Sequence, residues 1–250
     1  MLSQFIWWGS IALEVLLLVR GSREKLAFRY PVFYSYISFV LVQDIFFFAV
    51  YRNTQINATV YWTAEFLSVM FGCAVVFEVY RVALLSYPGT ARMARSVLAL
   101  VFALALAKGI ANAWGDHGWW LAVNTREIER VLRTMQAAAI LGLFSLFLLY
   151  AIPFAKNLRG ILLGYGSFVA VRVISLQFVP ERQRDFWAYA YSASYLLALG
   201  IWVAHLWAYS ESPVPKPATA RLENDYQRLA AATRRRLEAA RGQVVKAVRS

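Results

Sequence analysis

The chain lacks most of the side chains that disulfides, metal ions or haem require. Its single cysteine, Cys73, cannot form an intrachain disulfide, and neither a CxxC pair nor an HExxH motif is present. The two histidines, His117 and His205, are far apart in the sequence and are expected on opposite sides of a membrane. We therefore expect no metal site and no cofactor.

Charged residues are also scarce. They make up 16% of the chain and hydrophobic residues 60%, whereas soluble domains have roughly a quarter charged and about half apolar residues. The apolar residues form blocks of about 20, the length that an α-helix needs to cross roughly 30 Å of hydrocarbon. No charged side chain occurs in the first four residues, so the first block is expected to be a retained span rather than a secretory signal. This pattern predicts an all-α, polytopic membrane protein.

The polar breaks between apolar blocks predict seven transmembrane helices. The expected spans are 4–20, 31–51, 58–83, 95–114, 130–153, 161–180 and 186–210. Residues 1–210 would then form a seven-helix bundle, residues 211–218 a proline-rich linker, and residues 219–250 a basic amphipathic helix.

The distribution of lysine and arginine predicts the orientation. The connections after the first, third and fifth spans contain Arg20, Arg23, Lys25, Arg29, Arg81, Arg92, Arg95, Lys156 and Arg159. The opposite connections contain fewer basic residues, and acidic residues, Glu129 among them, balance their charge. The positive-inside rule places the N-terminus outside and the C-terminus in the cytoplasm of a plasma (inner) membrane.

The predicted tail helix carries one apolar stripe and many basic residues. Such a helix binds an anionic membrane surface, or it docks on a protein partner as a short coiled coil. No recognition motif accompanies the basic residues, so nucleic-acid binding is not expected.

Ionisable residues within the spans are the candidates for function. Counting 1.5 Å per residue places one group at a common depth in the outer half of the membrane: Asp44, Glu65, Lys108, Arg133, Gln136 and Arg172. Charges in hydrocarbon usually face the bundle interior and pair with one another. Asp44 is therefore expected to pair with Lys108, Arg133 or Arg172. The group either fixes the order of the helices or lines an outward-facing pocket for a small polar or anionic solute.

A second polar group is expected near the cytoplasmic side. It comprises Glu14, Glu78, Arg81, Ser167 and His205. Glu78 and Arg81 are three residues apart on one helix face, which favours a local ion pair.

Known catalytic arrangements fit the sequence poorly. Ser167 in Gly164-Tyr-Gly-Ser-Phe168, together with His205, superficially resembles the serine and histidine of intramembrane serine proteases, but Phe168 stands where that family has glycine. Glycines 164 and 166 are better explained by close helix packing. No lysine lies between Lys156 and Lys216, which excludes a retinal Schiff base in the seventh span. We expect no enzymatic activity.

Three functions agree with these observations. The first is a receptor-like or sensory protein whose outer pocket binds a solute and whose tail contacts a partner or the membrane surface. The second is a small-solute or proton-coupled transporter, which would need a further access route past Glu14, Glu78 and His205. The third is a non-catalytic scaffold or accessory subunit, in which the buried charges are structural.

Overall fold

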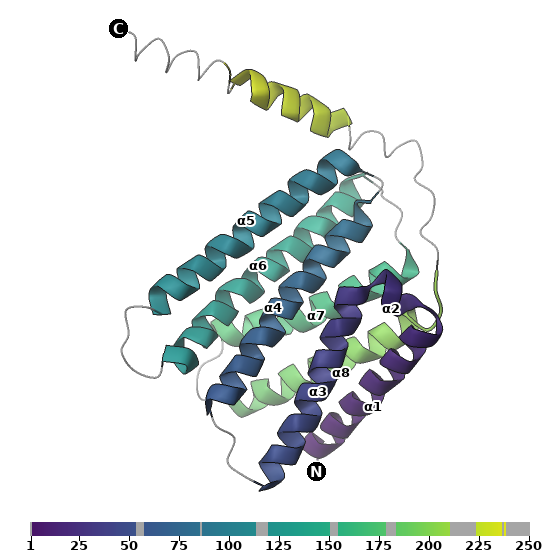
Figure 1. Ribbon diagram of the computed structural model, residues 1–250, viewed down its shortest axis with the longest axis vertical. Coiled ribbons are helices and arrows are strands. Elements are labelled where there is room, and N and C mark those ends of the chain that lie inside the picture. The colour runs from purple at the N-terminus through teal and green to yellow at the C-terminus, as the bar shows by residue number, and fades with distance from the viewer. Residues whose placement is uncertain are drawn as a thin grey trace.

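The computed structural model of the protein describes residues 2–53, 58–85, 87–113, 120–150, 155–178, 184–210, 224–236 and 238. Among these residues the regular structure is helical, and no strand occurs (Figure 1). The helices are α1 (Leu2–Arg23), α2 (Leu26–Arg29), α3 (Pro31–Asn53), α4 (Ala58–Ala83), α5 (Pro88–Ala113), α6 (Trp120–Tyr150), α7 (Lys156–Phe178) and α8 (Arg184–His205).

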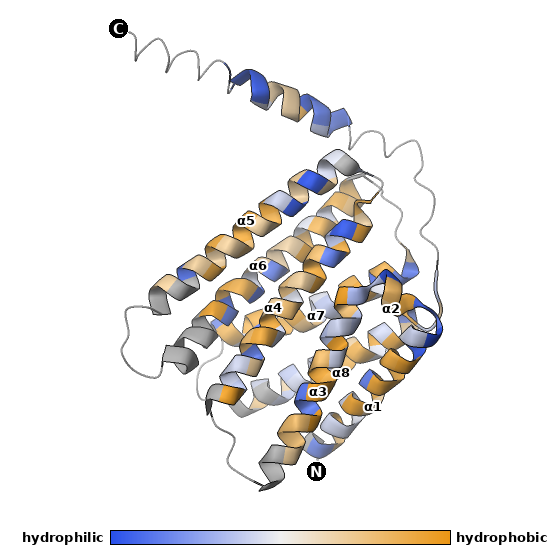
Figure 2. Ribbon diagram, viewed as in Figure 1, coloured by the Kyte–Doolittle hydropathy of each residue, from blue (hydrophilic) through white to orange (hydrophobic). Residues whose placement is uncertain are grey.

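Six helices in the described part of the chain are long and apolar enough to cross a membrane. The corresponding segments are Gln4–Arg23, Pro31–Ala49, Val60–Ala83, Gly89–Lys108, Ile128–Leu149 and Lys156–Gln177. They overlap the first six predicted spans. Apolar residues run along these helices, including their outer surfaces (Figure 2). These features support a multi-pass, helical membrane protein.

The seventh predicted span coincides with α8, which is not among those six segments. Its 22 residues are long enough to cross a membrane. However, its first half contains several tyrosines and serines, which lower its mean hydropathy.

Several helices begin earlier than the apolar blocks do. α6 begins at Trp120, α5 at Pro88 and α7 at Lys156, where the predicted spans began at residues 130, 95 and 161. A helix continues through polar residues as long as its backbone hydrogen bonds can form, so composition marks the apolar part and not the helix ends. As a result, Glu129 lies inside α6 rather than in an exposed connection.

The predicted linker and most of the predicted tail helix lie outside the described residues. Residues 224–236 are helical, and most of their side chains are exposed. Figure 2 shows hydrophilic residues over much of this helix.

The helices form a bundle in which α1, α4 and α8 begin, and α3 ends, at the same end (Figure 1). α8 packs against both α1 and α7, and α1 also packs against α3. α4 contacts α3, α5, α6 and α7. Five helices, α1, α3, α4, α7 and α8, therefore form a closed ring of contacts around one region of the interior.

The first turn of α3 is capped by a carboxylate from α4. The backbone N–H groups of Val32 and Phe33 donate hydrogen bonds to Glu78 Oε1 and Oε2 at 2.9 and 2.8 Å. Pro31, at the first helical position, has no N–H to satisfy. The predicted Glu78–Arg81 ion pair is not found among the described residues: the Arg81 side chain is exposed, and the buried Glu78 stabilises a helix N-terminus instead.

Glycines on α7 allow α8 to approach closely. A Cβ atom at Gly164 would overlap the indole of Trp202, and one at Gly160 would overlap His205. Trp202 is fully buried, and its Nε1 donates a hydrogen bond to the carbonyl oxygen of Ile161 at 3.2 Å. The interface between α7 and α8 thus depends on residues without side chains.

We expect Gly164→Ala to lower the free energy of unfolding by about 1–3 kcal/mol, because the new methyl group would displace the Trp202 ring. Gly200→Ala is the matched control, since a Cβ atom there has no neighbour within 4 Å. Alanine at that position should be neutral or slightly stabilising. Unfolding in mixed micelles measures both variants, and equal stabilities would contradict the close packing of α7 and α8.

Candidate functional site

One face of α6 supplies three buried polar side chains to the interior of the bundle. Glu129, Arg133 and Gln136 are four and three residues apart, which places them on one helix face. Arg133 and Gln136 are fully buried, and Glu129 is 1% exposed. A charged residue so fully removed from solvent requires partners on the neighbouring helices.

Arg172 of α7 is the main partner of Glu129. Its Nε and Nη2 atoms donate hydrogen bonds to Glu129 Oε1 and Oε2 at 2.5 and 2.8 Å, a bidentate arrangement. Arg133 Nε lies 3.7 Å from Glu129 Oε1, and Arg172 Nη2 lies 3.5 Å from Glu65 Oε1. Two arginines therefore face two glutamates, drawn from α4, α6 and α7, and the formal charge of this cluster is zero. We call these four residues the arginine–glutamate cluster.

Gln136 extends the cluster toward α4 and α7. Its Oε1 accepts hydrogen bonds from Arg133 Nη1 at 3.3 Å and from the Tyr165 hydroxyl at 3.1 Å. Its Nε2 donates to the carbonyl oxygen of Val69 and to the sulfur of Cys73, both at 3.1 Å. The one cysteine of the chain is thus a buried packing residue and a weak acceptor.

Aromatic rings cover the arginines. The Arg172 guanidinium lies 4.3 Å from the centroid of the Tyr191 ring, and that of Arg133 lies 5.3 Å from the centroid of Phe168. Such contacts stabilise a cation that has lost its water. No hydrogen-bond acceptor meets Arg133 Nε or Nη2 among the described residues.

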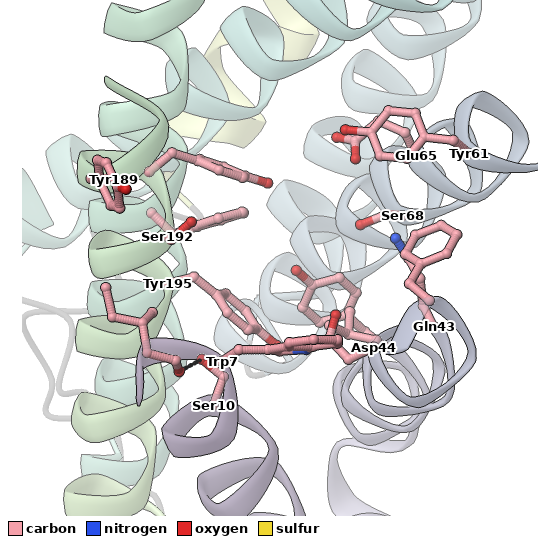
Figure 3. Close-up of a pocket in the computed structure, with 16 residues that line it drawn as sticks. Trp7, Ser10, Gln43, Asp44, Tyr61, Glu65, Ser68, Tyr189, Ser192 and Tyr195 are labelled. Atoms are coloured by element: carbon pink, nitrogen blue, oxygen red, sulfur yellow. Dashed lines mark hydrogen bonds between the residues drawn. The ribbon is translucent and has the colours of Figure 1, made fainter. Parts of the chain in front are cut away.

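Beside the arginine–glutamate cluster lies a cavity of about 750 Å³. Its wall is formed by α1, α3, α4, α7 and α8. The lining residues are Ile6, Trp7, Ser10, Tyr36, Val40, Gln43, Asp44, Phe47, Tyr61, Glu65, Ser68, Phe168, Tyr189, Tyr191, Ser192 and Tyr195. Figure 3 shows side chains of α8 facing those of α3 and α4 across the space, with Trp7 and Ser10 of α1 beside them. We call this space the polar cavity.

The first group of sequence candidates is divided between these features. Glu65, Arg133, Gln136 and Arg172 contact one another in one network, and Glu65 also lines the polar cavity. Asp44 lines the cavity, but within the described part of the chain it forms no ion pair with Lys108, Arg133 or Arg172. Lys108 is exposed on α5, away from the interior.

The second group of candidates does not assemble. Glu14 is fully buried, and its Oε1 accepts a hydrogen bond from the Tyr195 hydroxyl at 2.7 Å. Ser167 donates to the carbonyl of Gly164 within its own helix, at 2.9 Å. His205 Nδ1 lies 3.0 Å from the carbonyl oxygen of Ile201. Ser167 and His205 are thus occupied locally and do not form a nucleophile–base pair in this structure.

Sequence reasoning missed Glu129 as an interior residue and Tyr189 as a cavity-lining residue. Glu129 was assigned to an exposed connection, although its spacing from Arg133 and Gln136 already indicates a shared helix face. Tyr189, Tyr191, Ser192 and Tyr195 of α8 line the cavity, and counting residues along the last predicted span places the last three at the depth of the outer polar group. The polar first half of this 22-residue helix was the available signal for Tyr189.

The described residues contain no group of three or more histidine, cysteine, aspartate or glutamate side chains placed to hold a metal ion. Comparisons of the chain with protein-family models, with curated proteins and with solved structures found no match.

Proposed function

We propose that the protein is a receptor-like membrane protein that binds a small polar solute in the polar cavity. The observation that carries this proposal is the cavity itself, whose volume of about 750 Å³ lies within the usual range of roughly 300–1,000 Å³ for small-molecule sites. Polar and ionisable groups inside a membrane bundle are costly, and they usually mark a ligand or ion pathway. Asp44, Glu65 and Ser68 face the cavity rather than lipid.

The proposal includes α8 as a seventh span. A helix of 22 residues is about 33 Å long at 1.5 Å per residue, enough for the hydrocarbon core. α8 packs between α1 and α7, and both of these are among the six helices that are long and apolar enough to cross a membrane. Tyr189, Tyr191 and Tyr195 lower its hydropathy, and all three line the cavity.

We further propose that the cavity faces the outside of the cell. It lies where α1, α4 and α8 begin and where α3 ends. The opposite end holds the last turn of α1, which contains Arg20 and Arg23, and the start of α7 at Lys156. By the positive-inside rule that opposite end is cytoplasmic, in a plasma (inner) membrane.

Packing at the opposite end supports a receptor more than an open pathway. Phe33 and Trp202 are fully buried and in edge-to-face contact, with ring centroids 5.0 Å apart. Tyr34 is also buried and contacts Phe33. These rings fill the interior between α3 and α8. A solute that enters the polar cavity would therefore stop there.

The basic tail is the proposed reporting element. Arg228, Arg234, Arg235 and Arg236 are exposed on the helix at residues 224–236. Each basic residue near an anionic leaflet contributes about 1 kcal/mol to membrane binding. We propose that the tail binds the inner membrane surface or a protein partner.

A stability screen of the purified full-length protein tests solute binding. The panel contains neutral sugars, amino acids, organic acids and amines, and the measured quantity is the Tm in detergent. A solute at a hundredfold its Kd should stabilise the folded state by about 2.7 kcal/mol, so at least one class should raise the Tm. If no class does so, the proposed binding function is wrong.

Uptake into liposomes separates this receptor from the two other functions. A receptor should be stabilised by a solute that it does not carry into the liposomes. A transporter would carry the same solute into the liposomes. A scaffold would do neither, and it would lose a co-purifying partner when residues 211–250 are removed.

A further inference from the structure

The lining of the polar cavity has a distinctive chemistry. Asp44 and Glu65 are the two charged residues among the described residues that line it, and neither lysine nor arginine is present there. Half of the lining side chains are aromatic, among them Trp7, Tyr61 and Tyr195. Carboxylates surrounded by ring faces attract cations, because the face of an aromatic ring is the negative end of its quadrupole.

The charge balance around the cavity points in the same direction. Arg172 and Arg133 are neutralised within the arginine–glutamate cluster, where Glu129 alone accepts two hydrogen bonds from Arg172. Neither arginine lines the cavity. An anion entering the space would therefore meet Asp44 and Glu65 without a free basic side chain from the described residues.

Two acids, one lining the cavity and one beside it, have no basic partner among the described residues. Within the described part of the chain, neither Asp44 nor Glu14 forms an ion pair. Glu14 is fully buried, and no hydrogen-bond partner meets its Oε2 among the described residues. Tyr195 connects Glu14 to the cavity, since it donates to Glu14 and lines the wall. An acidic side chain set among aromatic rings is stabilised by a counter-charge, and no basic side chain of the described residues supplies one to Asp44.

We infer that the solute bound in the polar cavity is a small organic cation, with an ammonium group at Asp44 and an apolar body against the aromatic wall. This inference rests on the proposed binding function and specifies its ligand class. The volume of about 750 Å³ is larger than a simple metal ion requires and suits a ligand of several carbon atoms. The organic body explains why the acids are set among rings rather than among further oxygen ligands.

Three probes of similar size and different charge test the inference on the purified full-length protein. They are 2-phenylethylammonium, 3-phenylpropionate and 2-phenylethanol, and the readouts are the Tm and the Kd by titration calorimetry. The ammonium probe should raise the Tm by about 5 °C near saturation, and the other two should bind far more weakly. Asp44→Asn should raise the Kd of the ammonium probe by roughly 10- to 100-fold, since a charge-assisted contact is lost.

Glu24→Gln is the matched control for removing an acid. Glu24 is partly exposed and pairs with Arg20 at 3.2 Å, outside the cavity lining. This variant should bind the ammonium probe like the wild type. Trp7→Leu is a second test that leaves Asp44 in place. It should weaken binding of the ammonium probe several-fold, because one aromatic ring of the cavity wall is removed.

The outcomes distinguish this inference from the function on which it rests. Preferential binding of the propionate or the alcohol would contradict a cationic ligand and would still agree with the proposed binding of a solute. Binding of none of the three probes would also overturn it, while the wider panel above still decides whether the cavity binds a solute. Should Asp44→Asn fail to fold, wild-type affinity of Trp7→Leu for the ammonium probe would contradict the aromatic cation site.

Discussion

Replacing Glu129 with glutamine should destabilise the protein by about 3–5 kcal/mol, the usual cost of removing one partner of a buried ion pair. Glu129 accepts two hydrogen bonds from Arg172 at 2.5 and 2.8 Å, and it lies 3.7 Å from Arg133. The substitution keeps the size of the side chain and removes its charge. Two buried guanidinium groups would then share only Glu65, which lies 3.5 Å from Arg172.

A double substitution makes this expectation more specific. Adding Arg172→Gln to Glu129→Gln leaves one arginine and one glutamate, so the cluster is neutral again. The double variant should therefore be more stable than the sum of the two single losses predicts. Stability is measured by unfolding in mixed micelles, at a pH where carboxylates and guanidinium groups are charged.

Glu24→Gln serves again as the control, because an exposed pair contributes only about 0–1 kcal/mol. A Glu129→Gln variant as stable as Glu24→Gln would show that the stability of the protein does not depend on balanced charges in the arginine–glutamate cluster. Additive losses in the double variant would show that Glu129 and Arg172 do not interact.

The sequence predicted the class of fold well because that class depends on composition. Blocks of about 20 apolar residues admit few structures besides spanning helices. The six apolar helices follow from this requirement alone. Their ends were predicted less well, since α6 begins at Trp120 and runs through polar residues before the apolar block starts.

Depth along a helix could also be predicted, but rotation about the helix axis could not. Counting residues placed Glu65, Arg133, Gln136 and Arg172 at one level, and the structure has them in one network. Lys108 was counted at the same level, yet its side chain is exposed on α5. A helix with apolar residues on all sides gives no signal for which side faces its neighbours.

The partner of Asp44 illustrates the same difficulty. Any of three basic residues at a matching depth was a reasonable partner, and opposite charges in a bundle usually pair. Arg172 instead binds Glu129, a residue that the sequence suggested was outside the membrane. Only the positions of all the helices show that Asp44 faces the polar cavity instead of a guanidinium group.

The existence of a water-filled space next to Asp44 can be tested by thiol chemistry, because Cys73 is buried and is the one cysteine of the chain. Thiols react as thiolates, which form in water and not in hydrocarbon. In a Cys73→Ala background, Ser68→Cys would place a thiol on the cavity wall. Leu141→Cys would place one on the outer surface of α6, where Leu141 is 66% exposed and is expected to meet lipid.

The most direct measurement is the reaction of these two variants with a charged, membrane-impermeant methanethiosulfonate in right-side-out and inside-out vesicles. We predict that Ser68→Cys reacts rapidly in right-side-out vesicles and that Leu141→Cys stays largely unmodified in both. Reaction of Ser68→Cys only in inside-out vesicles would reverse the proposed orientation. If Ser68→Cys is no more reactive than Leu141→Cys in either preparation, no solvated cavity exists in the bundle and the proposed binding site is contradicted.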